Sequence, residues 1–336
     1  MLVKKLINDP FAVVDEMIDG FIAAHPDLVK RAPGGNGRAV VRVDAPIAGK
    51  VGVIIGGGSG HEPAFMGYVG IGSVDGCPVG NVFASPSPDP ILAATKAVSG
   101  GAGVIYSYGN YSGDVMNFDM AAEMAGAEGI EVRTILVTDD VASAPKGRED
   151  ERRGIAGGFF VYKAMAAKAH EKATLAEVEA TGRKANDRTR TMGVALAACT
   201  VPAAGRPTFS LAENEMEIGL GIHGEPGMRR GPLETADKVT DALVDAILAD
   251  MPLGKGDRVA VLVNGLGATP AMELYIMFRH AAARLAAIGV TIHRSYVGEY
   301  VTSLEMAGAS ITLLHLDDEL TRLIDAAANT PMFVQV

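Results

Sequence analysis

Apolar positions in the first half of the chain follow helical and strand periods in turn. Residues 11–25 repeat apolar side chains at helical spacing. Short apolar runs at 40–43, 51–55, 104–106 and 132–137 predict strands. Between them, we expect a helix that Asp89 caps and Pro90 starts, ending near residue 100, and a second helix over 116–124. This alternation predicts an α/β fold in which helices cover a parallel sheet.

The second half continues the alternation. A charged surface loop is expected at 145–153, followed by a helical connection over 157–185. A strand at 215–221 precedes a helix over 235–250, and the later expected elements are strands at 259–263, 290–296 and 311–316 and a last helix. The pattern therefore predicts two α/β domains, residues 1–185 and 186–336, each with a largely parallel or mixed sheet flanked by helices.

Composition narrows the class of protein. The chain has 336 residues, of which 48% are hydrophobic and 21% charged, as in globular enzymes. Its formal net charge of -10 and its lack of a Lys/Arg cluster argue against binding nucleic acid or an anionic membrane. The two cysteines, Cys77 and Cys199, form no disulfide framework, and no Cys/His spacing indicates a metal site.

Targeting signals are also absent from the pattern. The N-terminal segment Met1–Asp9 is basic but lacks the apolar run of a signal peptide. No stretch approaches the roughly 20 apolar residues of a membrane span. We therefore expect a cytoplasmic protein that does not associate with a membrane.

Three glycine-bearing loops follow predicted strands, at 56–63, 109–114 and 264–270. Ligands of parallel sheets bind at the carboxyl ends of strands, so these loops would converge on one crevice if the sheet were continuous. Four glycines at 56–60 let backbone N–H groups point at a ligand, although a simple tight turn explains them as well. The loop lacks the Gly-Lys-Ser/Thr of a nucleotide P-loop.

Three side chains near these glycines could carry chemistry. His61 directly follows the first loop, and His223 lies between glycines in a segment after a predicted strand. Histidine is the commonest acid–base catalyst, but a single histidine is more often structural. Asp114 could act as a general base for a hydroxyl or simply cap a helix. The residues alone indicate an enzyme with two exposed histidines and an aspartate acting on a small polar molecule, without naming the reaction.

The ordered motifs resemble the K subunits of dihydroxyacetone kinases. The similar segments run from Lys5 to Leu314 and cover nearly the whole chain. They are Lys-Leu-Ile-Asn-Asp at 5–9, Gly-Gly-Gly-Ser-Gly-His-Glu-Pro at 56–63, Asn-Tyr-Ser-Gly-Asp at 110–114, Ala-Cys-Thr-Val-Pro at 198–202, Asn-Glu-Met-Glu at 214–217, Gly-Ile-His-Gly-Glu-Pro-Gly at 221–227, Leu-Gly-Ala-Thr-Pro at 266–270 and Ser-Ile-Thr-Leu-Leu at 310–314.

This resemblance implies a mechanism. His223 would bind a small ketose covalently as a hemiaminal, and a polyol without a carbonyl group would be rejected. Asp114 would accept the proton of the substrate hydroxyl during phosphoryl transfer, and His61 would assist as an acid–base group or hydrogen-bond partner. Gly58, Ser59 and Gly60 would contact the substrate through the backbone.

The resemblance also implies partners. In this family the K subunit binds no cofactor or metal itself, and ADP or ATP with Mg2+ is carried by a separate L subunit. A phosphotransferase-system subunit re-phosphorylates the L-bound nucleotide in many bacteria, whereas ATP is exchanged in others. K modules are typically homodimers.

One departure from the family pattern bears on the substrate. A lysine usually precedes the Asn-Tyr-x-Gly-Asp motif, whereas this chain has Gly109. The lost side chain opens space, so the substrate could be a longer ketose such as erythrulose. A non-catalytic ketose-binding regulator is a further alternative, although Asp114 is retained. A hydrolase or isomerase is disfavoured, because position 61 is histidine where a G-x-S-x-G motif around Ser59 needs glycine.

Overall fold

The computed structural model describes residues 4–336 and forms two compact units. The first unit comprises Met1–Leu136, Val161–Lys184 and Arg322–Val336, and the second comprises Val137–Phe160 and Ala185–Thr321. Residues 1–3, which begin the basic N-terminal segment, lie outside the described residues. The chain thus enters each unit more than once, and the expected pair of domains divided after residue 185 stays a prediction.

The first unit is built on a mixed sheet with the strand order β1, β2, β5, β3, β6, β7, and β4 pairs with β5 outside this row. β3 runs parallel to β6 and to β5, whereas β2 is antiparallel to β1 and to β5. The strands span Val29–Arg31 (β1), Ala39–Arg42 (β2), Gly52–Ile55 (β3), Gly57–Ser59 (β4), Gly76–Val82 (β5), Val104–Gly109 (β6) and Val132–Val137 (β7).

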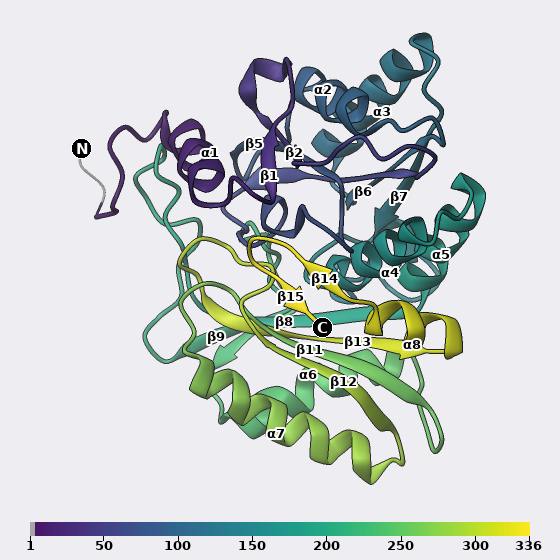
Figure 1. Cartoon of the computed structure of the whole chain (residues 1–336). Coiled ribbons are helices and arrows are strands. Elements are labelled where there is room, and N and C mark those ends of the chain that lie inside the picture. The colour runs from purple at the N-terminus through teal and green to yellow at the C-terminus, as the bar shows by residue number, and fades with distance from the viewer. Residues whose placement is uncertain (1–3) are drawn as a thin grey trace. The chain divides into compact units, whose positions relative to one another are not determined.

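Two neighbouring helices cover strands of this sheet. α2 and α3 lie side by side and pack against β2, β3, β5 and β6 (Figure 1). Their buried side chains Ile91 and Phe118 join Ile54 and Tyr106 of the strands in one apolar core. The helices of this part of the chain span Val13–Ala24 (α1), Pro88–Val98 (α2), Ser112–Ala127 (α3), Gly158–His170 (α4) and Leu175–Asp187 (α5).

The second unit has its own six-stranded sheet, in the order β10, β9, β8, β13, β11, β12. Only the β11–β12 pair is parallel, and the other neighbours are antiparallel. The strands span Thr189–Ala197 (β8), Glu215–Ile218 (β9), Arg229–Pro232 (β10), Arg258–Gly265 (β11), Thr291–Gly298 (β12) and Ala307–Leu316 (β13).

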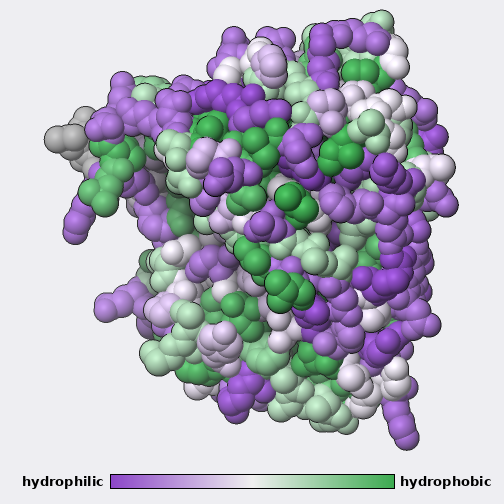
Figure 2. Space-filling view, in the orientation of Figure 1, coloured by the Kyte–Doolittle hydropathy of each residue, from purple (hydrophilic) through white to green (hydrophobic). Residues whose placement is uncertain are grey.

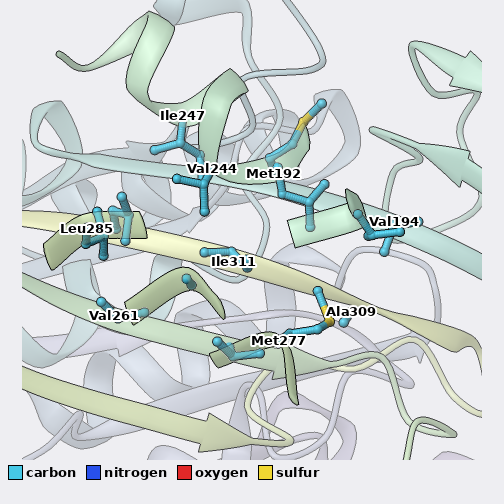
Figure 3. Close-up of a cluster of buried hydrophobic side chains, with 14 of the residues drawn as sticks. Met192, Val194, Val244, Ile247, Val261, Met277, Leu285, Ala309 and Ile311 are labelled. Atoms are coloured by element: carbon cyan, nitrogen blue, oxygen red, sulfur yellow. The ribbon is translucent and has the colours of Figure 1, made fainter. Parts of the chain in front are cut away.

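Helices α6 (Ala236–Asp250) and α7 (Ala271–Ala287) pack on this second sheet. Val244, Ile247 and Leu285 of the helices meet Val261 and Ile311 of the strands in a fully buried cluster (Figure 3). Apolar burial of this kind contributes roughly 25 cal/mol per Å2. The chain ends with α8 (Asp318–Asp325) and the short pair β14 (Ala328–Asn329) and β15 (Val334–Gln335).

The predicted fold class, α/β with sheets flanked by helices, is confirmed, and both main sheets contain parallel and antiparallel strand pairs.

Several local predictions were wrong. The helix expected to be capped by Asp89 begins one residue earlier, at Pro88, and Ser87 occupies the cap position. The first turn of a helix makes no intrahelical hydrogen bond through its N–H groups, so it accommodates both Pro88 and Pro90. The strand expected over 215–221 ends at Ile218, because Gly219 has φ +80°.

The helical connection at 157–185 is two helices, α4 and α5. Lys172 has φ 56°, which ends the first helical run. Thr174 then caps the second helix, because its Oγ1 accepts the Glu177 N–H at 3.3 Å while the Glu177 carboxylate accepts the Thr174 N–H at 2.8 Å. This reciprocal capping box is readable in the sequence as Thr-Leu-Ala-Glu.

Hydrophilic and hydrophobic side chains are interspersed on the face seen in Figure 2. Within residues 4–336, none of the helices is long and apolar enough to cross a bilayer. The mixed hydropathy of this face marks no separate binding surface on it.

Candidate functional site

The glycine loop after β3 is held tightly by backbone contacts. Its segment β4 pairs in parallel with β5, and the Ser59 hydroxyl donates a hydrogen bond to the Gly80 carbonyl at 2.7 Å. A side chain at Gly58 would begin 2.6 Å from the backbone nitrogen of Ala84, so only glycine fits there. Gly58 and Ser59 therefore fix the backbone from which Gly60 and His61 follow.

His61 is buried, with 3% of its surface exposed, so the expectation of an exposed side chain was wrong. Its ring stacks on Phe83, with centroids 5.1 Å apart and planes 16° apart. Phe65 meets the ring edge-on at a centroid distance of 6.3 Å. The two aromatic rings fix the orientation of the imidazole, which an acid–base group requires.

Glu62 lies beside His61 and is a feature that the sequence interpretation missed. Its carboxylate accepts the Gly60 N–H at 3.0 Å. Burial raises the pKa of the Glu62 carboxyl group above its ordinary value. A half-buried carboxyl group is thus adjacent in sequence to the buried histidine, and the Gly-His-Glu-Pro motif was the signal for it.

Asp114 lies in the first turn of α3 and is 8% exposed. Tyr111 occupies the cap position, so Asp114 is not the helix cap. A largely buried carboxyl group in the first turn of a helix can act as a proton acceptor for a substrate hydroxyl.

Sheet topology brings the His61 and Asp114 loops to the same edge of the first sheet. β3 and β6 are adjacent and parallel, with Ile55 opposite Ser107, so both loops leave from carboxyl ends. The segment 83–86 contacts both loops: Phe83 stacks on His61, and the Asn117 side chain of α3 donates to the Pro86 carbonyl at 2.8 Å. This segment was not predicted as part of the site, although its Ser/Pro-rich sequence indicates a loop.

His223 lies in the second unit, in a turn after β9. The Gly219 N–H donates to the Gly193 carbonyl at 2.7 Å, and the Gly221 N–H donates to the Glu225 carbonyl at 2.9 Å. Gly224 has φ +90° and its N–H returns to the Gly221 carbonyl at 2.9 Å. Positive φ at two glycines thus makes a tight turn that holds His223 at its tip.

Glu225 binds His223 at two points. One carboxylate oxygen accepts the His223 backbone N–H at 2.9 Å, and the other lies 3.0 Å from Nδ1 of the ring. The His223 side chain is 25% exposed. Burial alone would raise the pKa of Glu225, but the hydrogen bond with His223, and the attraction of this ring when it is protonated, lower it to about 2. In the neutral form of His223, the ionised Glu225 can accept a hydrogen bond from Nδ1–H, and this tautomer leaves the lone pair on Nε2.

The third glycine loop, at 264–270, follows β11 of the second sheet. The two sheets are separate, so the condition under which the three loops were expected to converge, a continuous sheet, is not met. The Asn264 side chain instead accepts the N–H groups of Tyr300 and Val301, each at 2.9 Å, and its amide donates to the Val301 carbonyl. This loop is thus fixed by its neighbours in the second unit.

The candidate site residues accordingly divide into two groups. Gly58, Ser59, Gly60, His61 and Asp114 lie at one edge of the first sheet, and His223 with Glu225 lies in the second unit. Among residues 4–336, no group of three or more His, Cys, Asp or Glu is placed to hold a metal ion. A histidine that contacts a carboxylate, as His223 does, can act as a nucleophile. The His61 and Asp114 side chains can act separately as acid–base groups.

Comparison with known proteins agrees with this α/β architecture. Residues 19–332 match the Dak1 domain family. A dihydroxyacetone-binding subunit DhaK of a PTS-dependent dihydroxyacetone kinase from Listeria innocua is 47% identical over 330 residues, covering 98% of this chain and 99% of the relative. A D-erythrulose kinase from Mycolicibacterium smegmatis is 47% identical over 98% of this chain, which spans 56% of that protein.

A solved structure supports the same assignment. The crystal structure of the dihydroxyacetone kinase of C. freundii superposes with a TM-score of 0.88 at 34% identity, over 99% of this chain and 61% of that chain. The chain belongs to the Dak1 domain family. The resemblance to the K subunits of dihydroxyacetone kinases, inferred from the ordered motifs, is confirmed.

Proposed function

We propose that this chain is the ketose-binding subunit of a dihydroxyacetone-type kinase, a phosphotransferase that acts on the primary hydroxyl of a short ketose. The observation that carries the proposal is the His223–Glu225 pair, with Nδ1 and Oε1 3.0 Å apart. The pair presents Nε2 of a neutral imidazole as a nucleophile. The relatives named as dihydroxyacetone-binding subunits support a ketone as the electrophile.

Binding would proceed by addition. The Nε2 lone pair attacks the ketone carbon, a C–N bond forms, and the π electrons of the carbonyl move to its oxygen. That oxygen gains a proton while Nδ1 loses one to Glu225 and solvent, so the product is a neutral hemiaminal. Glycerol lacks the carbonyl group and cannot form this bond, which makes the selection chemical.

Phosphoryl transfer would then use the first unit. Asp114 accepts the proton of the primary hydroxyl as its oxygen attacks the terminal phosphoryl group of the donor. His61 donates a hydrogen bond to the tethered substrate or shuttles a proton, and the backbone at Gly58, Ser59 and Gly60 contacts the substrate hydroxyls. The covalent tether supplies orientation that a substrate of this size cannot gain from many contacts.

The donor would come from another polypeptide. We infer a nucleotide-bearing L subunit that carries ADP or ATP with Mg2+, and re-phosphorylation by a phosphotransferase-system subunit is one route for ADP. The relative from Listeria innocua, named as PTS-dependent, supports this route. We also expect two copies of this chain to pair as a homodimer.

A second substrate is favoured by one observation. Gly109 replaces the lysine usual in the family at the end of β6, and a relative at 47% identity is named D-erythrulose kinase. We expect the smaller residue to leave room for the extra hydroxymethyl carbon of erythrulose. Erythrulose is therefore the alternative ketose within the same mechanism.

Nuclear magnetic resonance of the carbonyl carbon tests the covalent site. Dihydroxyacetone labelled with 13C at C2 should change from an sp2 to an sp3 signal on binding the wild-type protein, and His223→Ala should abolish the change. His280→Ala is the matched control, because His280 also contacts a carboxylate (Asp241, 2.8 Å) in the same unit but lies on helix α7. Folded wild-type protein that forms no adduct with either ketose would overturn the proposal.

Asp114→Asn tests catalysis separately from binding. With an L subunit supplied, this variant should keep the adduct but lose about 10²- to 10⁴-fold in turnover, as expected for removal of a general base. Asp119→Asn, an exposed aspartate on the same helix, is the control. Loss of adduct and turnover together in Asp114→Asn would assign Asp114 to binding instead.

A further inference from the structure

Arg153 joins three separate parts of the second unit. Its Nε lies 2.9 Å from one Asp140 oxygen, and its Nη2 lies 2.8 Å from the same oxygen. Nη2 also donates to the Gly219 carbonyl at 3.3 Å, and Nη1 lies 4.0 Å from Oε2 of Glu225. One guanidinium group thus contacts the start of the His223 turn and approaches the carboxylate that binds His223.

Gly221 makes this arrangement possible. A side chain at this position would collide with both the Glu225 carboxylate and Nη1 of Arg153. The turn therefore brings its backbone close to the arginine and the glutamate at the same point. Because no positive φ requires glycine at this position, the space taken by Glu225 and Arg153 is what favours a residue without a side chain.

Asp140 anchors the same guanidinium group in the interior. Asp140 is 1% exposed, and its neighbour Asp139 accepts the N–H groups of Ile155 at 2.8 Å and Gly157 at 2.7 Å. Burial raises the pKa of Asp140 to about 6 although Arg153 opposes the rise, so Asp140 is ionised above neutral pH. The Arg153 side chain is itself only 16% exposed and cannot drift into solvent.

We propose that Arg153 is a positioning residue for His223, holding the turn through Gly219 and the Glu225 carboxylate from the anchor at Asp140. This inference rests on the proposed ketose site. Arginine suits this position because its planar guanidinium group carries five N–H donors, which can face the Asp140 carboxylate, the Gly219 carbonyl and the Glu225 carboxylate together. The ammonium group of lysine is a single point charge and cannot reach all three. With Arg153 in place, Glu225 keeps the Nδ1–H tautomer, and Nε2 stays aimed at the ketone.

Three variants test the role in protein that is otherwise intact. Arg153→Gln removes the charge and the fork, Arg153→Lys restores the charge alone, and Arg152→Lys is the neighbouring control. Arg152 is fully buried and donates hydrogen bonds to Asp250 and to the Ala144 carbonyl. The readouts are ketose affinity from the labelled adduct, the KM and kcat of coupled turnover, and the His223 tautomer from 15N-histidine spectra.

Arg153→Gln should weaken the adduct about tenfold or more, raise KM more than it lowers kcat, and mix the Nδ1–H and Nε2–H signals of His223. Arg153→Lys should recover part of the affinity. Arg152→Lys should lower the melting temperature while leaving the tautomer and adduct unchanged. These spectral changes distinguish positioning from a general loss of stability.

Two negative results have different meanings. If wild-type protein forms no His223 adduct, the proposed ketose function fails and the role of Arg153 in it fails with it. If the wild type forms the adduct and folded Arg153→Gln keeps both its affinity and a single Nδ1–H tautomer, the ketose function stands and the positioning role is overturned.

Discussion

His223 and Glu225 are joined twice, through the ring Nδ1 at 3.0 Å and through the backbone N–H at 2.9 Å. The carboxylate therefore sets both the tautomer of the ring and the position of the backbone that carries it. Histidines that act as nucleophiles or ligands are commonly fixed in this way by a carboxylate on the opposite nitrogen. The two-residue separation places both partners of the pair within one turn.

Glu225→Gln should leave the turn folded but weaken ketose binding. The amide keeps the size of the side chain, yet it loses the charge that accepts the Nδ1 proton, so the adduct should weaken about tenfold or more. Affinity from the labelled ketose measures the effect. Glu234→Gln is the control, because Glu234 pairs with Arg229 at 3.6 Å in the same unit and has no contact with His223 in the described structure. Unchanged affinity in Glu225→Gln would remove the carboxylate from the mechanism.

Gly221→Ala should impair the site although it adds only one carbon atom. The added methyl group would displace Glu225 and Arg153 together, so we expect at least about a tenfold loss of ketose affinity from a single carbon atom. Gly231→Ala is the matched control, since an added carbon there meets nothing within 4 Å. Equal affinities for the two variants would mean that the close approach at Gly221 has no functional consequence.

Acid stability should depend on Asp250. Burial alone would raise the pKa of this carboxyl group, but hydrogen bonds from Arg152 and Arg190 lower it to about 2 from 3.8. A depressed folded-state pKa stabilises the protein above pH 3.8, and this contribution is lost as the pH falls towards 2. Asp250→Asn should therefore cost about 1–2 kcal/mol at pH 7, after allowance for solvent screening, and flatten the loss of stability below pH 4.

Urea unfolding of wild type and Asp250→Asn at pH 7, 4 and 3 measures this linkage. Asp318→Asn is the control, because Asp318 pairs with Arg258 but its side chain is 99% exposed. We expect this surface pair to contribute little. Parallel pH profiles for Asp250→Asn and wild type would contradict the assignment of acid sensitivity to Asp250.

The sequence predicted the strands and helices with strong periodicity and the loops that carry His61, Asp114 and His223. It did not predict β5, whose glycines and Pro78 hide its strand pattern, or β8, although both are central to their sheets. Without these strands, the sequence pattern could not give the strand order of either sheet. The pairing of β3 with β6, and the separation of β11 into another sheet, depend on contacts far apart in sequence.

Side-chain environments were harder to predict than positions. Glycines before His61 suggested exposure, but Phe65 and Phe83 bury the ring, and only tertiary contacts show this. Glu225 was visible in the His-Gly-Glu-Pro motif without an assigned role, because its double contact with His223 depends on the positive φ of Gly224. Arg153 carries no signal in the sequence, since it lies about 70 residues from the turn that it contacts.

Gly109 provides a test of substrate choice. It occupies the end of β6, and Asp114 follows five residues later in α3. The wild type should turn over erythrulose at least as well as dihydroxyacetone, because a longer ketose gains room where a lysine would lie. Gly109→Lys should shift the ratio of kcat/KM values towards dihydroxyacetone by about tenfold, since a nearby cation also stabilises charge on the transferring phosphoryl group.

Gly109→Met separates the two causes, because it adds comparable length without the charge. A shift in both variants indicates lost space, and a shift in Gly109→Lys alone indicates the charge. A marked preference of the wild type for dihydroxyacetone would contradict the link between Gly109 and a longer substrate.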